Sequence, residues 1–104
     1  MVSDTQLRRW FREYNQRYFG GMLPRDTAVY YATVDGGYGD CDYKSDGRFH
    51  IRINPDNTWG RSVRRLTLLH EMVHIAVWPR VTHGPYFERE MMRLASAGAM
   101  RGIW

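Results

Sequence analysis

Residues 61–78 read RSVRRLTLLHEMVHIAVW, and this stretch decides the fold of the chain. Apolar residues recur in it at intervals of three and four, which predicts a helix, and Pro79 marks its end. The predicted apolar stripe comprises Leu66, Leu69, Val73, Ala76 and Val77. Because Leu68 and Ile75 add apolar surface outside this stripe, we expect the helix to be buried nearly all round.

Candidate metal ligands lie inside this helix, in the sequence His70-Glu71-Met72-Val73-His74. Two histidines four positions apart share one helix face, so both imidazoles can reach one metal ion, and zinc suits such ligands. Glu71 lies about 100° round the helix, where it can hydrogen-bond to a metal-bound water without ligating the metal. A buried His and Glu without a metal or partner would be costly, which favours a metal site over a chance match.

A catalytic zinc takes three protein ligands and keeps a fourth position open. The downstream candidates for the third ligand are His83, Glu88 and Glu90. His83 follows His74 by nine positions, where the next helix is predicted to begin, so a short loop can bring it back to the first two histidines. The two glutamates would ligate only if that next helix crossed the first near its middle. We therefore predict His83 as the third ligand.

An amphipathic helix is predicted over residues 3–19. Its apolar face comprises Leu7, Trp10, Phe11, Tyr14 and Tyr18, and its off-stripe arginines are Arg8, Arg9, Arg12 and Arg17. Ser3 and Gln6 have the spacing of a capping box, and Gly20-Gly21 supplies the stop. Arg9 and Glu13 have the spacing of an ion pair on one helix face.

Strands are predicted between these two helices. Residues 28–34 are rich in β-branched and aromatic side chains, residues 35–40 read as a turn-rich loop, and residues 48–53 alternate between apolar and polar. The alternation directs Phe49, Ile51 and Ile53 toward the core and Arg48, His50 and Arg52 outward. His50 is accordingly interpreted as an ordinary surface residue.

A last helix is predicted to begin at Gly84-Pro85, with the proline at its first position, and to fray toward Gly98. Its buried face comprises Phe87, Met91, Leu94 and Ala95. The order of helix, strands and two helices predicts an α+β domain. At 104 residues, we expect one domain over residues 1–104.

Composition excludes several classes of protein. With 43% hydrophobic and 14% aromatic residues, the chain can build a core, so disorder is not expected. No run approaches the about 20 apolar residues of a membrane span, and residues 1–4 do not begin a secretory signal. The single cysteine, Cys41, excludes an internal disulfide, so we expect a reducing, cytoplasmic location. We also expect a monomer.

The net charge of +4 is carried by arginine, which supplies fourteen of the fifteen basic residues. A guanidinium binds phosphate oxygens in pairs, which suits nucleic acid, whereas codon bias and solvated surfaces are the ordinary explanation. Arg61, Arg64 and Arg65 open the HExxH helix, where they could bind a backbone phosphate or form a solvated turn paired with Asp56.

A few aromatic residues and the cysteine are further candidates. Tyr86, near His83, and Tyr38 are candidate donors to an oxyanion, with Tyr86 the nearer in sequence. Trp78 and Phe87 are expected to pack the ligand-bearing helices together, and the methionines, Met72, Met91, Met92 and Met100 among them, to fill the core. Cys41 is interpreted as a small buried residue rather than a metal ligand.

These motifs together resemble a known family. His70-Glu71-x-x-His74, Trp78 and His83-Gly84-x-x-Phe87 resemble the signature of the SprT-like family, the zincin-fold metalloprotease domain that Spartan-type DNA–protein crosslink proteases also carry. Residues 14–24 are similar to the family's N-x-x-x-F-x-x-x-L-P segment, and residues 39–43 with the 48–53 strand are similar to its central hairpin. Many members also carry a zinc ribbon with paired cysteines, which a sequence with one cysteine is not expected to contain.

The resemblance implies a minimal zincin-like domain in which His70, His74 and His83 hold one Zn²⁺ and Glu71 is the general base. The implied activity is that of a zinc-dependent endopeptidase acting on protein or peptide substrates, with DNA-associated proteins as one class and DNA as a partner. The alternative is a catalytically inactive, zinc-containing module that binds nucleic acid. Glu71 argues against it, because a structural zinc does not need that carboxylate. Hydrolysis of a non-peptide bond is a third interpretation, since HExxH fixes the nucleophile and not the substrate.

Overall fold

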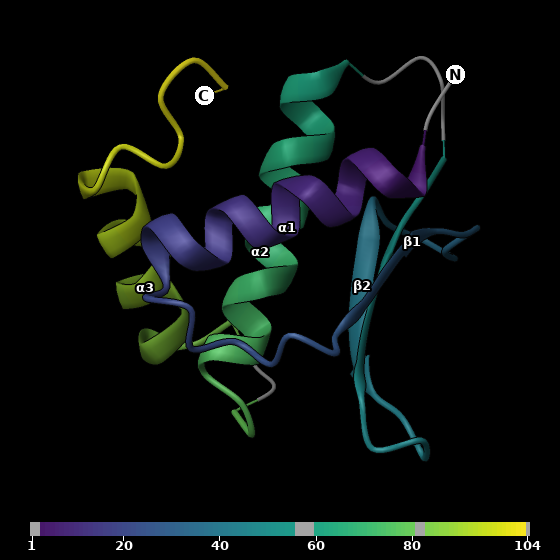
Figure 1. Cartoon of the computed structure of the whole chain (residues 1–104). Coiled ribbons are helices and arrows are strands. Elements are labelled where there is room, and N and C mark those ends of the chain that lie inside the picture. The colour runs from purple at the N-terminus through teal and green to yellow at the C-terminus, as the bar shows by residue number, and fades with distance from the viewer. Residues whose placement is uncertain (1–2, 56–59, 81–82, 104) are drawn as a thin grey trace.

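A computed structural model describes residues 3–55, 60–80 and 83–103. The elements are α1 (Asp4–Tyr18), β1 (Ala28–Tyr31), β2 (Gly39–Tyr43), β3 (Phe49–Ile53), α2 (Arg61–Ala76) and α3 (Pro85–Ser96) (Figure 1). This is the predicted α+β arrangement of a minimal zincin-like domain. No helix in the described part of the chain is long and apolar enough to cross a membrane.

The sheet has three strands in the order β1-β3-β2. β1 runs parallel to β3, with Val29 opposite Ile51, and β2 runs antiparallel to β3, with Cys41 opposite Ile51. The hairpin pairing leaves β2 at one edge of the sheet as described. This edge matters for the site, because α2 packs against β2 and β3.

The core lies where the helices meet the sheet. Figure 1 shows α1 crossing α2, with the sheet to one side of the crossing and α3 to the other. The largest fully buried side chains are Leu7, Ile51, Ile53, Leu68, Leu69, Met72, Val73 and Leu94. Four of them lie on α2, as expected for a central helix that is apolar nearly all round.

The alternation of β3 is confirmed, because Phe49, Ile51 and Ile53 are buried. The interpretation of His50 as an ordinary surface residue is wrong. Its Nδ1 lies 3.0 Å from the Tyr30 hydroxyl and its Nε2 lies 2.8 Å from an Asp46 carboxylate oxygen. The parallel pairing of β1 with β3, which sequence alone did not reveal, brings Tyr30 to His50.

Several boundaries near the N-terminus differ from prediction. Ser3 is the N-cap of α1 but makes no side-chain capping hydrogen bond, so the capping box does not form. β1 ends at Tyr31, although the propensity for strand continues to Val34. β2 begins at Gly39, inside the stretch predicted as a loop, because pairing with β3 overrides its turn-like composition. The predicted ion pair of Arg9 with Glu13 does not occur among the ion pairs of the described residues.

The last two helices also need corrections. α2 ends at Ala76, two residues earlier than predicted, and Ala76 itself is exposed. Pro85 does open α3, as predicted. On α3 Ala95 is exposed, and Met92 is 71% exposed and so does not fill the core.

A buried asparagine fastens the connection from α1 to the sheet. Asn15 is 5% exposed; its Nδ2 donates to the Leu23 carbonyl at 3.0 Å, and its Oδ1 accepts from the Leu23 amide at 3.1 Å. Between them the chain reverses at Gly20 and Gly21, which have φ of 60° and 72°, values that favour glycine. The spacing between Asn15 and Leu23-Pro24, which resembles the family's N-x-x-x-F-x-x-x-L-P segment, therefore has a physical basis in these two hydrogen bonds.

Candidate metal centre

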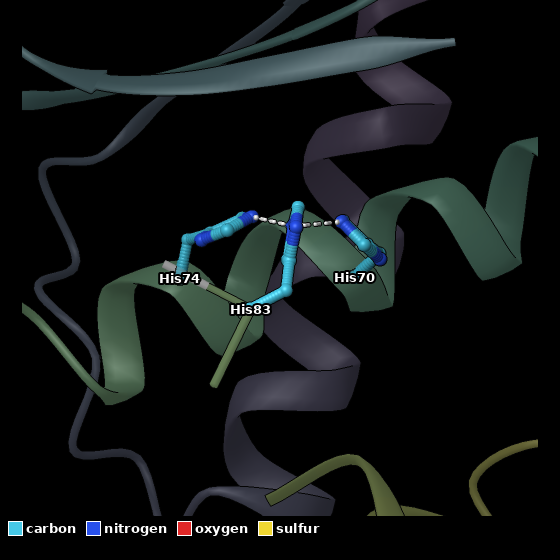
Figure 2. Close-up of side chains that lie close together, drawn as sticks. All are labelled: His70, His74 and His83. Atoms are coloured by element: carbon cyan, nitrogen blue, oxygen red, sulfur yellow. Dashed lines mark hydrogen bonds between the residues drawn. The ribbon is translucent and has the colours of Figure 1, made fainter. Parts of the chain in front are cut away.

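Three histidines from two segments meet on one side of α2. His70 and His74 project from α2 one turn apart, and His83 comes from the loop that precedes α3. Figure 2 shows the His83 ring standing between the other two, with its Nε2 directed at theirs. One ligand atom from each residue lies within 4.8 Å of the others. The structure therefore brings together all three histidines that the sequence singled out.

The spacing of the nitrogens fits a metal ion. His83 Nε2 lies 3.2 Å from His70 Nε2 and 3.1 Å from His74 Nε2. Tetrahedral zinc with Zn–N bonds of about 2.0–2.1 Å requires nitrogens about 3.3 Å apart. Direct hydrogen bonding cannot satisfy both contacts, because His83 Nε2 carries either one proton or one lone pair. A cation at the centre accommodates all three lone pairs.

The electrostatics also prepare these rings for a cation. Burial lowers the pKa of His70, and the neighbouring His83 lowers it further. Burial, together with His70 and His83, lowers the pKa of His74 to about 4. Both rings are therefore neutral at pH 7, and a neutral imidazole is the form that binds a metal.

Phe87 supports the cluster from α3. It is buried, and its ring centroid lies 4.8 Å from that of His70 and 4.7 Å from those of His74 and His83. Its predicted packing role between the ligand-bearing segments is confirmed. Trp78 has a different role, since it packs on the sheet with its ring 5.4 Å from Phe49 and 6.2 Å from Tyr43.

Glu71 lies beside the cluster and outside it. Its side chain is on the buried side of α2, only 5% exposed, and it is not one of the clustered metal-ligating groups. Burial raises the pKa of Glu71 to about 7, with a further contribution from Asp40. A carboxyl group with a pKa near neutrality can both accept and return a proton, which is what a general base must do.

A small pocket of about 280 Å³ opens beside Glu71. Its described lining comprises Tyr38, Gly39, Leu66, Thr67, His70 and Glu71. Of the two tyrosines considered as oxyanion donors, Tyr38 is the one that lines this pocket. Tyr86 instead lies beneath Arg80, whose guanidinium carbon is 4.0 Å from the Tyr86 ring centroid.

The other candidates do not join the cluster. Glu90 pairs with Arg93, and Glu88 is exposed; neither belongs to the group of clustered metal-ligating side chains. Cys41 is free and half-buried. Burial raises the pKa of its thiol to about 12, and the charge of Glu71 adds to this rise, so Cys41 is not a thiolate at neutral pH.

Sequence reasoning missed Gly39. A Cβ at this position would lie 2.6 Å from the Arg52 carbonyl oxygen and 3.1 Å from Thr67 Cγ2. Only glycine therefore lets β2 approach both β3 and α2 this closely. The signal that could have found it is its place at the start of residues 39–43, which the family resemblance placed in a hairpin with the 48–53 strand, as the pairing of β2 with β3 confirms.

The arginines at the start of α2 pack on α1. Arg65 Nε donates to the Tyr14 hydroxyl at 2.5 Å, and the guanidinium carbons of Arg61 and Arg65 lie 5.8 and 5.9 Å from the Trp10 ring centroid. The suggested pairing with Asp56 falls outside the described residues. The structure thus gives Arg61 and Arg65 aromatic partners that periodicity could not reveal.

Comparison with protein-family models agrees with this arrangement, although comparison with individual curated proteins finds no match. The model of the SprT-like family matches residues 7–102. This range contains the hydrogen-bonded pair Asn15 and Leu23, the sheet and the three histidines. The chain therefore belongs to the SprT-like family.

Proposed function

We propose that this protein is a zinc-dependent endopeptidase. The observation that carries the proposal is the convergence of His70, His74 and His83 beside a buried Glu71 that is not part of the cluster. Three nitrogen ligands leave a fourth position open, which distinguishes a catalytic zinc site from a structural one. Membership of the SprT-like family supports the same class of activity.

Each residue has a part in peptide hydrolysis. His70, His74 and His83 would hold the metal, and bound zinc supplies Lewis acidity that polarises a carbonyl and acidifies water. Glu71 takes up the proton of the attacking water and returns it to the leaving amine. The backbone of β2, at the sheet edge above α2, offers hydrogen bonds to an extended substrate chain.

The metal part of the proposal is tested by elemental analysis of protein purified without added metal or chelator. We expect about one zinc per chain in the wild type and its loss in His74→Ala. His50→Ala is the matched control, because His50 lies in the sheet outside the cluster and its removal is expected to leave the zinc in place. A folded wild type that takes up no zinc even when supplied with it overturns the metal site.

The catalytic part is tested by cleavage of a denatured protein. Glu71→Gln removes the base while preserving shape, so we expect zinc to stay bound and cleavage to fall by at least about a hundredfold. Wild type and Glu71→Gln that are equally inert on several substrates, with and without single-stranded DNA, would contradict peptidase activity.

The basic surface of α1 supports the proposal that nucleic acid is a partner of this protein. If the protein does not cleave peptides, the same surface makes nucleic acid its main ligand. A groove of about 740 Å³ is lined by Arg12, Glu13, Tyr14, Gln16, Arg17, Tyr18 and Arg65. Within the described chain, no carboxylate forms an ion pair with Arg12, Arg17 or Arg65. Arg65 Nε instead donates to the Tyr14 hydroxyl, and among the described residues its terminal nitrogens have no hydrogen-bond partner, so they are suited to phosphate oxygens.

Binding to this groove is tested with labelled single-stranded DNA over a salt series. Replacing Arg12 and Arg17 by Gln should weaken binding and reduce the slope of log K against log salt by about 0.7 for each phosphate that is no longer neutralised. Arg101→Gln, an exposed arginine after α3, is the control. An equally large effect of this control would show that the attraction is general and not a property of the groove.

A further inference from the structure

A groove of about 640 Å³, called here the Met22 groove, lies at the C-terminal end of α2. Figure 1 shows the loop that follows α1 passing the lower end of α2, and this loop forms one wall of the groove. The other described walls come from the ends of α1 and α2, from the start of β3 and from α3. Neither Glu71 nor any of the three clustered histidines is among the described lining residues, so the groove is separate from the metal centre.

Two large apolar side chains of the Met22 groove are open to water. Met22 is 85% exposed and Trp78 is 40% exposed. Clustered apolar surface on a folded protein marks a contact site, because leaving it in water forgoes the free energy of burial. A methionine also adapts its shape to different apolar partners.

The walls of this groove are held in place without an occupant. Asn15 fastens Leu23 through the two buried hydrogen bonds described above. Arg93 of α3 donates to the Tyr18 carbonyl at 2.7 Å, and its guanidinium carbon lies 5.6 Å from the Phe19 ring centroid. Because these contacts already order the loop, an occupant does not have to order it on binding.

The charge of the groove is balanced. Its charged lining residues in the described chain are Glu90 and Arg93, and they pair with each other. Phosphate oxygens therefore find no unpaired cation here, in contrast to the groove on α1 that Arg12 and Arg17 line. An apolar occupant suits the Met22 groove better than nucleic acid does.

The size of the groove suits single side chains. Twelve described residues line it, whereas each side of a stable protein interface comprises about 20–30 residues. The groove is therefore too small to hold two copies of this chain together. Its volume of about 640 Å³ instead falls within the about 300–1,000 Å³ of sites that enclose small groups.

The groove continues the line of the edge strand. Tyr43 ends β2, and its ring centroid lies 5.0 Å from that of Phe49 and 6.2 Å from that of Trp78, two residues that line the groove. Cys41, two residues earlier on β2, is close enough to Glu71 for that carboxylate to raise the pKa of its thiol. A strand rises about 3.3 Å per residue. A substrate chain that lies along β2 with a carbonyl at Glu71 therefore reaches the groove about three residues further on.

We propose that the Met22 groove binds a bulky apolar side chain of the substrate, about three to six residues from the bond that is cleaved. The proposal rests on the endopeptidase function and adds to it a second contact, distant from the metal centre. A Phe side chain buries far more apolar surface than a Ser side chain, so a substrate that carries Phe at this distance binds more tightly.

The test is a set of paired peptides built around a bond that wild type cleaves in a denatured protein. Each peptide extends about eight residues to either side of that bond, and the two members of a pair carry Phe or Ser at one position about three to six residues from it. For wild type we expect kcat/KM to be about tenfold higher for the Phe peptide at one of these positions, mainly through a lower KM. In Met22→Glu, which places a charge in the groove, this ratio should fall to about one.

Met92→Glu is the matched control, because Met92 is 71% exposed on α3, outside the described lining of the groove, and the change in charge is the same. It should keep the tenfold ratio, and so should Met22→Leu, which keeps an apolar side chain. Equal kcat/KM for the paired peptides in wild type, or a ratio that Met22→Glu and Met92→Glu lower alike, overturns the groove and leaves the endopeptidase standing. A wild-type dimer that Met22→Glu converts to a monomer in sedimentation would also overturn it, by assigning the groove to contact between copies.

Failure of the endopeptidase function gives a different result. If wild type cleaves nothing, isothermal titration of the zinc-loaded protein with an uncharged peptide that carries a central Phe-Leu-Phe segment, and with its Ser-Ser-Ser counterpart, decides the groove. Tighter binding of the first peptide that is lost in Met22→Glu and kept in Met92→Glu supports the groove without the activity. Equal dissociation constants for the two peptides, or a difference that Met22→Glu retains, overturn it.

Discussion

Glu71 combines a buried position with an ionisable side chain. Its carboxyl group is buried on the sheet side of α2, and its pKa is raised to about 7 by burial and by Asp40. Ionising such a group in the absence of a metal costs folding free energy. A chain selected for stability alone would not place a carboxylate there, so its presence points to a chemical role.

This cost makes the stability of the metal-free protein depend on pH. Well below pH 4.5 Glu71 is protonated in both the folded and the unfolded chain and makes no difference to the free energy of unfolding. As the pH rises from about 4.5 to about 7 the unfolded chain ionises first, so the folded state loses stability and then levels off. Replacing Glu71 by Gln removes this loss, so Glu71→Gln should gain about 2–3 kcal/mol over wild type at about pH 8 compared with about pH 4.5.

Urea unfolding of the two chelator-treated proteins at both pH values measures this difference. Every other titratable group is common to the two proteins, so the comparison isolates the contribution of Glu71. A gap between Glu71→Gln and wild type that stays constant across the pH range would contradict a raised pKa for Glu71.

Asn15 stabilises the fold through two buried hydrogen bonds to the backbone of Leu23. Asn15→Ala leaves both the Leu23 amide and its carbonyl without a partner. We expect a loss of about 2–4 kcal/mol in the free energy of unfolding, measured by urea titration. Gln16→Ala, the exposed neighbour, serves as the control and should change the stability by less than about 0.5 kcal/mol. Equal effects of the two substitutions would show that the Asn15–Leu23 hydrogen bonds do not contribute to the stability of the fold.

At the scale of elements, the position of β2 over α2 sets the shape of the site. The Asp40–Arg52 ion pair ties β2 to β3, with Arg52 Nε 2.9 Å from an Asp40 oxygen. Gly39 lets the beginning of the strand touch Thr67 of α2. These contacts place the edge strand next to Glu71, which the composition of residues 39–43 could not indicate.

A single methyl group at Gly39 should move this strand. The added Cβ of Gly39→Ala would lie 2.6 Å from a backbone oxygen of β3, which cannot yield without shifting the pairing. We expect the free energy of unfolding to fall by about 1–3 kcal/mol, with a loss of cleavage larger than that of metal binding. In the control Gly37→Ala the nearest atom is 3.7 Å away, and little change is expected. Circular dichroism melts, zinc content and cleavage of a denatured protein measure these changes; if Gly39→Ala behaves like Gly37→Ala, the close approach has no role.

At the scale of the whole molecule, a bound metal would join α2 to the segment before α3. The His83 ring contacts His70 and His74 on α2 and Phe87 on α3. Metal binding favours the folded state by RT ln(1 + [L]/Kd), or about 4 kcal/mol at a thousand times Kd. Chelation should therefore lower the melting temperature of wild type.

Variants separate this effect from a general one. His83→Ala should show almost no response to the chelator, because a ligand is already missing, whereas His50→Ala should respond as wild type does. Differential scanning calorimetry with and without chelator measures the shift. If zinc-supplied wild type melts at the same temperature with and without chelator, the metal does not contribute to the stability of the fold.

Much of this molecule could be predicted from its sequence, because the decisive signals are local. The i, i+4 spacing of His70 and His74 fixes a shared helix face wherever that helix lies, and alternation fixes which side of β3 is buried. Pro85 opens α3 for an equally local reason. The roles of the three histidines and of Glu71 in catalysis remain predictions, although the structure brings the side chains together.

Contacts between segments far apart in the chain were decided only by the tertiary structure. The partners of His50, the packing of Trp78 on the sheet and the approach of Gly39 to Thr67 depend on strand pairing and helix packing. Periodicity reports which face of an element is apolar and does not report what that face meets. The sequence by itself therefore determined the candidate ligands and the α+β class, whereas the tertiary structure decided the edge strand, the pocket and the cost of burying Glu71.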